Sequence, residues 1–171
     1  GTMLLLKEVL DFAKRKNFKL MIDVKNGPVF YPNIHIEIAR MVYDCNMQDK
    51  VWVISFDHKC IYDLKHQDDF PLKAGILYVA RLSHLKEVIQ LVGADFIETH
   101  NKYLTSETVM EAHDAGVQVC SWSTDNAEEI ERLLKLSVDM LTTNSPSIAR
   151  DIFQKTIISP NGAQERRNSI T

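Results

Sequence analysis

The chain has 171 residues and a formal net charge of −3, with 45% hydrophobic and 25% charged residues. This composition is ordinary for one soluble globular domain, and it lacks the basic excess of a nucleic-acid-binding protein. Three cysteines at positions 45, 60 and 120 are too few and too widely spaced for a disulfide framework or a zinc site, and no apolar run approaches the roughly 18 residues of a membrane span.

Helical and strand patterns alternate along the chain. Apolar residues at helical spacing predict a helix over residues 4–16, and the next apolar run, residues 20–25, predicts a buried strand. Further helices are expected at residues 34–47, 57–65, 83–92, 105–116, 126–136 and 147–154, and further strands at 51–56, 74–80, 95–100, 117–123 and 138–143. Expected helix N-caps are Asp57, Ser83, Thr105 and Asn126, the last in a capping box with Glu129.

Strict alternation with short connections and no hairpin signal predicts a parallel sheet of six βα units. A weak repeat of helix end, turn and strand start recurs around residues 93–95, 115–117 and 137–139. Six units suit an open doubly wound sheet or an incomplete (β/α)₈ barrel. No Gly-x-Gly-x-x-Gly turn or P-loop follows the first strand, which argues against a dinucleotide-binding sheet.

Polar or aromatic residues stand at the carboxyl ends of most predicted strands, as in a barrel active site. They are Asp23 and Lys25, Ser55 and Phe56, Glu98 and His100, Trp122, and Thr143 and Asn144. We therefore predict an α/β fold, an incomplete (β/α)₈ barrel of six units over residues 1–155, followed by a disordered tail at residues 156–171.

Each strand-end residue also has a structural interpretation. Asp23 and Lys25 share one strand face and could form an ordinary salt bridge, His100 could be a loop histidine, and Trp122 could fill the barrel. Asp23 is the strongest functional candidate, because a carboxylate at the end of a buried strand costs free energy unless it is paired or binds a metal. One carboxylate does not make a magnesium or calcium site, and Glu98 is the one obvious second carboxylate.

Several short motifs follow one another in a fixed order. They are Ile-Asp-Val-Lys at residues 22–25, Tyr-Pro at 31–32, Ser-Phe-Asp at 55–57, Gly-Ala-Asp at 93–95, the Ala-Gly pair that leads to Trp122, and Thr-Asn-x-Pro at 143–146. In order and spacing they resemble the glycerophosphodiester phosphodiesterase family, (β/α)₈ barrels of the phosphatidylinositol-phospholipase-C-like group. The resemblance runs from about residue 4 to about residue 153.

Two departures from the family pattern matter. Aspartate stands at position 23 where the family has glutamate, which keeps the charge and shortens the reach by one methylene. Family members also open with a His-Arg-Gly strand, a Glu-x-Asp strand and a second catalytic histidine, and none of these occurs in the 171 residues. Because a typical barrel has about 250 residues, we expect the chain to correspond to the last three quarters of such an enzyme.

The resemblance implies metal-assisted hydrolysis of glycerophosphodiesters to glycerol 3-phosphate and an alcohol, within lipid and glycerol metabolism, with Mg²⁺ or Ca²⁺ as cofactor. By family position, Asp23 would be a metal ligand. The catalytic-site residues would be Lys25, which would contact the phosphate, and Trp122, which would pack on the alcohol part. Glu98 and His100 would join them in binding substrate, and the 171 residues alone are expected to be inactive.

Alternative interpretations stay open. One is a non-catalytic short form or binding module of the same fold, and another is a lysophospholipase D or a sphingomyelinase D-like enzyme. The expected partner is a small glycerophosphodiester or lysophospholipid, without nucleic acid or a transmembrane segment. We also expect a cytoplasmic location, and self-association through the sheet edges that an incomplete barrel leaves open.

Overall fold

A computed structural model describes residues 3–158 of the chain. The elements follow in the order α1 (Leu6–Lys16), β1 (Leu20–Asp23), α2 (Ile34–Asp44), β2 (Val51–Ser55), α3 (His58–Lys65), β3 (Lys73–Tyr78), α4 (Leu85–Val92), β4 (Phe96–His100), the 3₁₀ turn η1 (Asn101–Tyr103), α5 (Ser106–Asp114), β5 (Gln118–Trp122), α6 (Ala127–Lys135), β6 (Met140–Leu141) and α7 (Pro146–Ile158). Within this part of the chain no helix is both long and apolar enough to cross a membrane.

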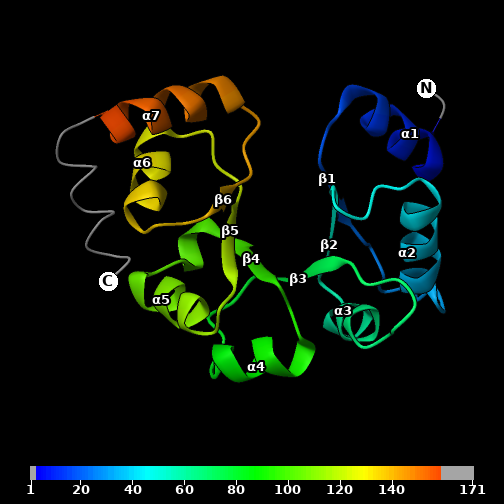
Figure 1. Cartoon of the computed structure of the whole chain (residues 1–171). Coiled ribbons are helices and arrows are strands. Elements are labelled where there is room, and N and C mark those ends of the chain that lie inside the picture. The colour runs from blue at the N-terminus through cyan, green and yellow to red at the C-terminus, as the bar shows by residue number, and fades with distance from the viewer. Residues whose placement is uncertain (1–2, 159–171) are drawn as a thin grey trace.

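The six strands form one sheet in sequence order, β1 to β6, and every neighbouring pair is parallel. Figure 1 shows the sheet curled, with the helices around its convex side. The predicted six-unit barrel-type α/β fold is therefore confirmed. A right-handed helical crossover after each strand places the next strand beside it, so the carboxyl ends of all six strands lie at one edge.

Side chains on the strands divide between two faces of the sheet, as period-two alternation requires. The outer face packs against the helices and forms the main hydrophobic core, which includes Val53, Ile76 and Ile97. The inner face carries a smaller apolar cluster, made of Ile54, Leu77 and Phe96 with Trp52, Trp122 and Met140 packed against it. The concave side of the curled sheet is therefore partly filled by its own side chains.

Two aspartates fix the alignment of neighbouring strands at their starting ends. Asp95 Oδ2 accepts a hydrogen bond of 2.8 Å from the backbone N–H of Ala74 on the preceding strand. Asp139 Oδ2 accepts one of 2.7 Å from the backbone N–H of Val119 in the same way. This hydrogen bond explains the aspartate in two members of the weak sequence repeat, at residues 93–95 and 137–139. In each, the aspartate follows a turn and directly precedes a strand.

Most expected caps form, and Ser83 is the exception. Asp57 and Thr105 accept the expected backbone hydrogen bonds. Ser83 lies one position too early, because His84 is the N-cap of α4 and has a left-handed backbone (φ 57°) with no side-chain cap. The free N–H of Lys86 in the first turn instead donates to Glu111 Oε1 on α5 at 3.1 Å.

The C-terminal boundary also differs from the expectation. Helix α7 continues to Ile158, past the predicted start of the tail at residue 156, and Thr156 Oγ1 donates back to the carbonyl of Ile152 at 2.9 Å. The remainder of the predicted tail, residues 159–171, lies outside the described residues.

We predict that Gly75→Ala strongly destabilises the fold. Gly75 on β3 lies opposite Phe96 on β4, and a Cβ atom there would come within 2.5 Å of two Phe96 ring carbons and 2.6 Å of the Phe96 carbonyl oxygen. Because one of these neighbours is backbone, a change of rotamer cannot relieve the clash. The free energy of unfolding, measured by urea denaturation, should fall by about 1–3 kcal/mol. Unchanged stability would contradict this packing of the inner face.

Candidate functional site

The strand register places the predicted site residues on the inner face of the sheet. His100 lies directly opposite Trp122, and Asp23 lies opposite Ile54, a member of the inner cluster. Glu98 on β4 lies opposite Leu77, also of the inner cluster. Parity within one strand predicts that Glu98 and His100 share a face, and the strand register shows that Asp23 and Trp122 lie on the same face, near the carboxyl edge.

A series of direct contacts links these residues along the edge. The Lys25 ammonium forms an ion pair with Asp23 and lies 5.6 Å from the centroid of the Phe56 ring. The Phe56 ring meets Trp122 edge-on at 6.2 Å, and Trp122 meets His100 edge-on at 5.1 Å. Together the five residues Asp23, Lys25, Phe56, Trp122 and His100 form what we call the rim cluster. It joins the ends of β1, β2, β4 and β5 into one surface.

The loop after β1 is held beside the rim cluster by a polar pair that sequence reasoning missed. Asn26 Nδ2 donates to Asp57 Oδ2 at 2.6 Å, and Asn26 Oδ1 accepts from the backbone N–H of Tyr31 at 2.8 Å. A cavity of about 380 Å³ opens here, lined by Val24, Lys25, Asn26, Gly27, Phe30, Ser55, Phe56 and Asp57. The Ser-Phe-Asp motif indicated a helix cap at Asp57 but gave no signal of this second contact.

Ser55 has a structural task at the end of β2. Its buried hydroxyl donates to the Val24 carbonyl at 2.7 Å and accepts from the Asp57 backbone N–H at 3.0 Å. Both bonds hold the ends of β1 and β2 together, as expected for a serine without a catalytic triad around it.

Thr143 and Asn144 also serve loop structure. Thr143 Oγ1 donates to Asp125 Oδ1 at 2.7 Å, and the Asn144 backbone N–H donates to the same oxygen at 2.7 Å. The hydrogen bond from Thr143, followed by the one from the Asn144 side chain, holds the pKa of Asp125 below its usual range. These residues tie the loop after β5 to the loop after β6.

Glu98 is the buried carboxyl group of the site. Only 5% of the residue is exposed, and its Oε1 accepts a hydrogen bond of 3.0 Å from Thr142 Oγ1. Burial raises the pKa of Glu98, against the opposing effect of the bonds from Thr142 and Cys120, and the charge of Asp23 raises it further. Trp122 Nε1 is likewise buried, without a hydrogen-bond partner among residues 3–158.

The carboxylates of the described residues do not make a complete divalent-metal site. Enzymes of the family that the sequence resembles are generally metal-dependent. Asp23 offers carboxylate oxygens at the edge of the sheet, but Mg²⁺ and Ca²⁺ take six or more oxygen ligands. Within residues 3–158, no group of three or more histidine, cysteine, aspartate or glutamate side chains is placed to hold a metal. The described residues thus provide one candidate ligand, Asp23.

We predict that Glu98→Gln stabilises the metal-free protein at pH 7. A folded-state pKa above the unfolded value means that the folded protein holds this proton more tightly, so wild-type stability falls as pH rises above the ordinary glutamate pKa. Glutamine does not ionise and avoids that loss. The variant's Tm should exceed that of the wild type by about 2–4 °C for each kcal/mol gained. The gain should vanish in thermal melts below pH 4, and an equal gain at both pH values would contradict the assignment.

Comparison with known proteins identifies a sequence relative. A glycerophosphodiester phosphodiesterase from Caldanaerobacter subterraneus is 27% identical over 150 residues, which cover 88% of this chain and 61% of that protein. The chain thus spans about three fifths of this relative's length.

Two solved structures share the fold. A putative glycerophosphoryl diester phosphodiesterase from Silicibacter pomeroyi matches with a TM-score of 0.78 and 22% identity, over 88% of this chain and 56% of that one. A phosphodiesterase from Oleispira antarctica, solved with the product sn-glycerol-3-phosphate, matches with a TM-score of 0.72 and 14% identity, over 87% of this chain and 60% of that one. The model of the glycerophosphoryl diester phosphodiesterase family matches residues 2–148, so the chain belongs to this family.

Proposed function

We propose that the protein hydrolyses glycerophosphodiesters to glycerol 3-phosphate and an alcohol with the help of a divalent metal. Family membership and the relative named glycerophosphodiester phosphodiesterase support the reaction class. The observation that carries the proposal is the rim cluster, because it sets an ammonium, a carboxylate and aromatic rings side by side at the carboxyl edge of a barrel-type sheet. The product bound to the Oleispira antarctica enzyme is the expected product here.

Lys25 and Asp23 are proposed to act on the phosphate. The Lys25 side chain is 69% exposed, so its ammonium is free to turn from Asp23 to a phosphate oxygen. Asp23 would then be available as one oxygen ligand of Mg²⁺ or Ca²⁺. Such a metal, when bound, polarises the phosphate and lowers the pKa of an attacking hydroxyl group.

Trp122, His100 and Glu98 are proposed to bind the remainder of the substrate. The aromatic pair Trp122 and Phe56 suits the alcohol part, and the His100 ring packs edge-on against Trp122 at 5.1 Å between ring centroids. Glu98, buried and hydrogen-bonded to Thr142, is proposed to form a hydrogen bond with a substrate hydroxyl.

A lysophospholipid is the second candidate substrate, and exposed apolar side chains favour it. Val29, Phe30 and Tyr31 follow β1 at the same edge and are 65%, 67% and 55% exposed, next to the exposed ring of Phe56. An acyl chain would bury this apolar surface, whereas a small polar alcohol would leave it in water.

The proposal includes a compartment and a mode of association. A cytoplasmic location is supported by the three cysteines, which are all buried free thiols. Within the described residues β1 pairs with β2 alone and β6 pairs with β5 alone. The outer edges of β1 and β6 offer unpaired backbone groups, which supports self-association of this chain when nothing else covers them.

We predict that Lys25→Ala lowers turnover far more than it lowers stability. Measured in a form of the protein that hydrolyses glycerophosphodiesters, kcat/KM should fall at least about tenfold, because a charge-assisted contact to phosphate is worth more than about 1.4 kcal/mol. The change in Tm should be small, since exposed ion pairs contribute little to folding.

Lys59→Ala is the matched control for this comparison. Lys59 is an exposed lysine on α3 whose ammonium pairs with Asp63 and lies over the Tyr62 ring. Its surroundings therefore resemble those of Lys25, but it lies outside the rim cluster. The control should leave kcat/KM unchanged. Equal losses of activity and stability in Lys25→Ala would favour an ordinary salt bridge.

We predict that residues 1–171 by themselves neither hydrolyse glycerophosphodiesters nor remain monomeric. The histidine pair that the family uses for proton transfer, worth on the order of 10²–10⁴ in rate, is absent from these residues. The checks are a hydrolysis assay with Mg²⁺, Ca²⁺ or Mn²⁺ and size-exclusion chromatography with light scattering. Metal-dependent turnover by a monomer would contradict both expectations.

A further inference from the structure

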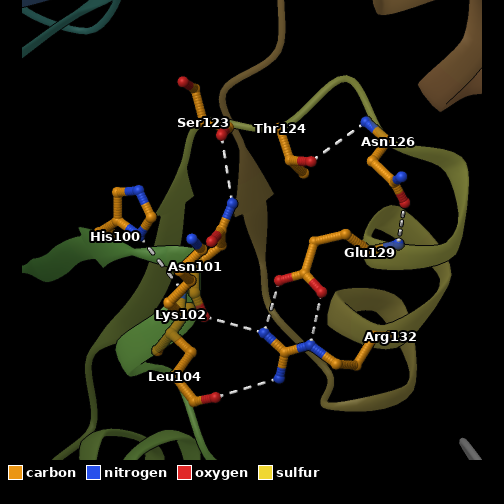
Figure 2. Close-up of polar contacts among 9 residues, drawn as sticks. All are labelled: His100, Asn101, Lys102, Leu104, Ser123, Thr124, Asn126, Glu129 and Arg132. Carbon is orange, nitrogen blue, oxygen red and sulfur yellow. Dashed lines mark hydrogen bonds and ion pairs between the residues drawn. The ribbon is translucent and has the colours of Figure 1, made fainter.

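The guanidinium of Arg132 on α6 reaches across to the turn that follows β4. Its Nη2 donates to the Asn101 carbonyl at 2.8 Å and its Nη1 donates to the Leu104 carbonyl at 3.1 Å. Glu129, one turn earlier on α6, holds the guanidinium with two further bonds, from Nε at 2.8 Å and Nη2 at 2.7 Å. Figure 2 shows the planar group held between the Glu129 carboxylate and the two carbonyls.

The turn that Arg132 holds is η1, which begins directly after His100. The Asn101 carbonyl also accepts the closing bond of this turn, from the Leu104 N–H at 3.1 Å. The buried Asn101 side chain donates to the carbonyl of Ser123 at 3.2 Å, and Ser123 directly follows Trp122 (Figure 2). One bonded unit therefore joins the two backbone segments that carry His100 and Trp122.

The same turn supplies a hydrogen-bond donor to one nitrogen of the His100 ring. The Lys102 backbone N–H donates to His100 Nδ1 at 3.3 Å. A nitrogen that accepts a hydrogen bond has no proton, so the neutral imidazole carries its proton on Nε2. The backbone N–H of Lys102 points at Nδ1 only while η1 keeps its shape.

Simple stabilisation of α6 would not require these contacts. A Glu–Arg pair three residues apart contributes only a few tenths of a kcal/mol. The Arg40–Glu37 pair on α2 has this spacing, and within residues 3–158 Arg40 makes no hydrogen bond to a loop carbonyl. The planar guanidinium of Arg132 instead donates to two carbonyls of the loop after β4, and a single lysine ammonium could not bridge both carbonyls.

We propose that Arg132 is a positioning residue, which holds η1 so that His100 presents a protonated Nε2 as a hydrogen-bond donor beside Trp122. The chemical role of that donor, a bond to a phosphodiester oxygen, rests on the proposed function. The geometry of the turn and the tautomer of His100 do not depend on it.

The test is a ¹H–¹⁵N NMR spectrum of the histidine side chains in the full chain, recorded at about pH 8, above the ordinary histidine pKa of about 6.5. Loss of one set of signals in His100→Gln assigns His100. Wild type should show His100 as the Nε2–H tautomer. In Arg132→Met, the Nδ1 and Nε2 shifts of His100 should move toward the tautomer mixture of free imidazole, while the other histidine signals stay in place.

Three further variants make the result decisive. Arg40→Met, the matched control, should leave the His100 signals unchanged, and Glu129→Gln should change them less than Arg132→Met. If Arg132→Met does not fold, Arg132→Lys takes its place and should show a partial shift. An unchanged His100 tautomer in a folded Arg132 variant would overturn the proposal. Absence of phosphodiesterase activity in a form of the protein that includes the family's histidine pair would overturn the proposed function alone, because the NMR readout needs no substrate.

Discussion

The parallel, in-register pairing of consecutive strands is the constraint on which the site depends. Because β4 and β5 pair with His100 opposite Trp122, the two rings must meet, and because β1 pairs with β2, Asp23 must face the same side as Ile54. A slip of one residue in any pair would turn these side chains to the helix-covered face. The aspartates before β4 and β6 hold the register of the β3–β4 and β5–β6 pairs by binding a backbone N–H of the neighbouring strand.

Polar residues at the carboxyl edge divide into two groups with different tasks. The first group forms hydrogen bonds to backbone groups and within itself, and these bonds shape the loops. Its members are Ser55, Asn26 with Asp57, Asp125 and Arg132. The rim cluster leaves groups available to a ligand, above all the exposed Lys25 ammonium. This division explains how irregular loops can carry a defined site, since the loop backbone is held by side chains rather than by the sheet.

Local patterns in the sequence were enough to predict the order of strands and helices, but not the long-range contacts around the candidate site. Alternating apolar periods predicted the six strands, and parity predicted that Glu98 and His100 share a face. That Asp23 and Trp122 lie on the same face follows from the strand register. The contacts of Asn26 with Asp57 and of Arg132 with the η1 turn join residues 31 positions apart, and no local period records such pairs. One half of the expected capping box at Asn126 forms, because Asn126 Oδ1 accepts from the Glu129 N–H. The other half does not form, because the Glu129 carboxylate binds Arg132 instead.

The central claim is that a phosphate ester binds at the rim cluster, and the two tryptophans of the chain test it most directly. Trp122 belongs to the cluster, whereas Trp52 packs on Phe96 at 5.3 Å, deeper on the inner face. We would follow both indole N–H signals by NMR during titration with sn-glycerol 3-phosphate in the presence of Mg²⁺. The account predicts a saturable shift of the Trp122 signal, lost in Lys25→Ala, with little change at Trp52. A Trp122 signal that stays in place throughout the titration, or a shift confined to Trp52, would contradict it.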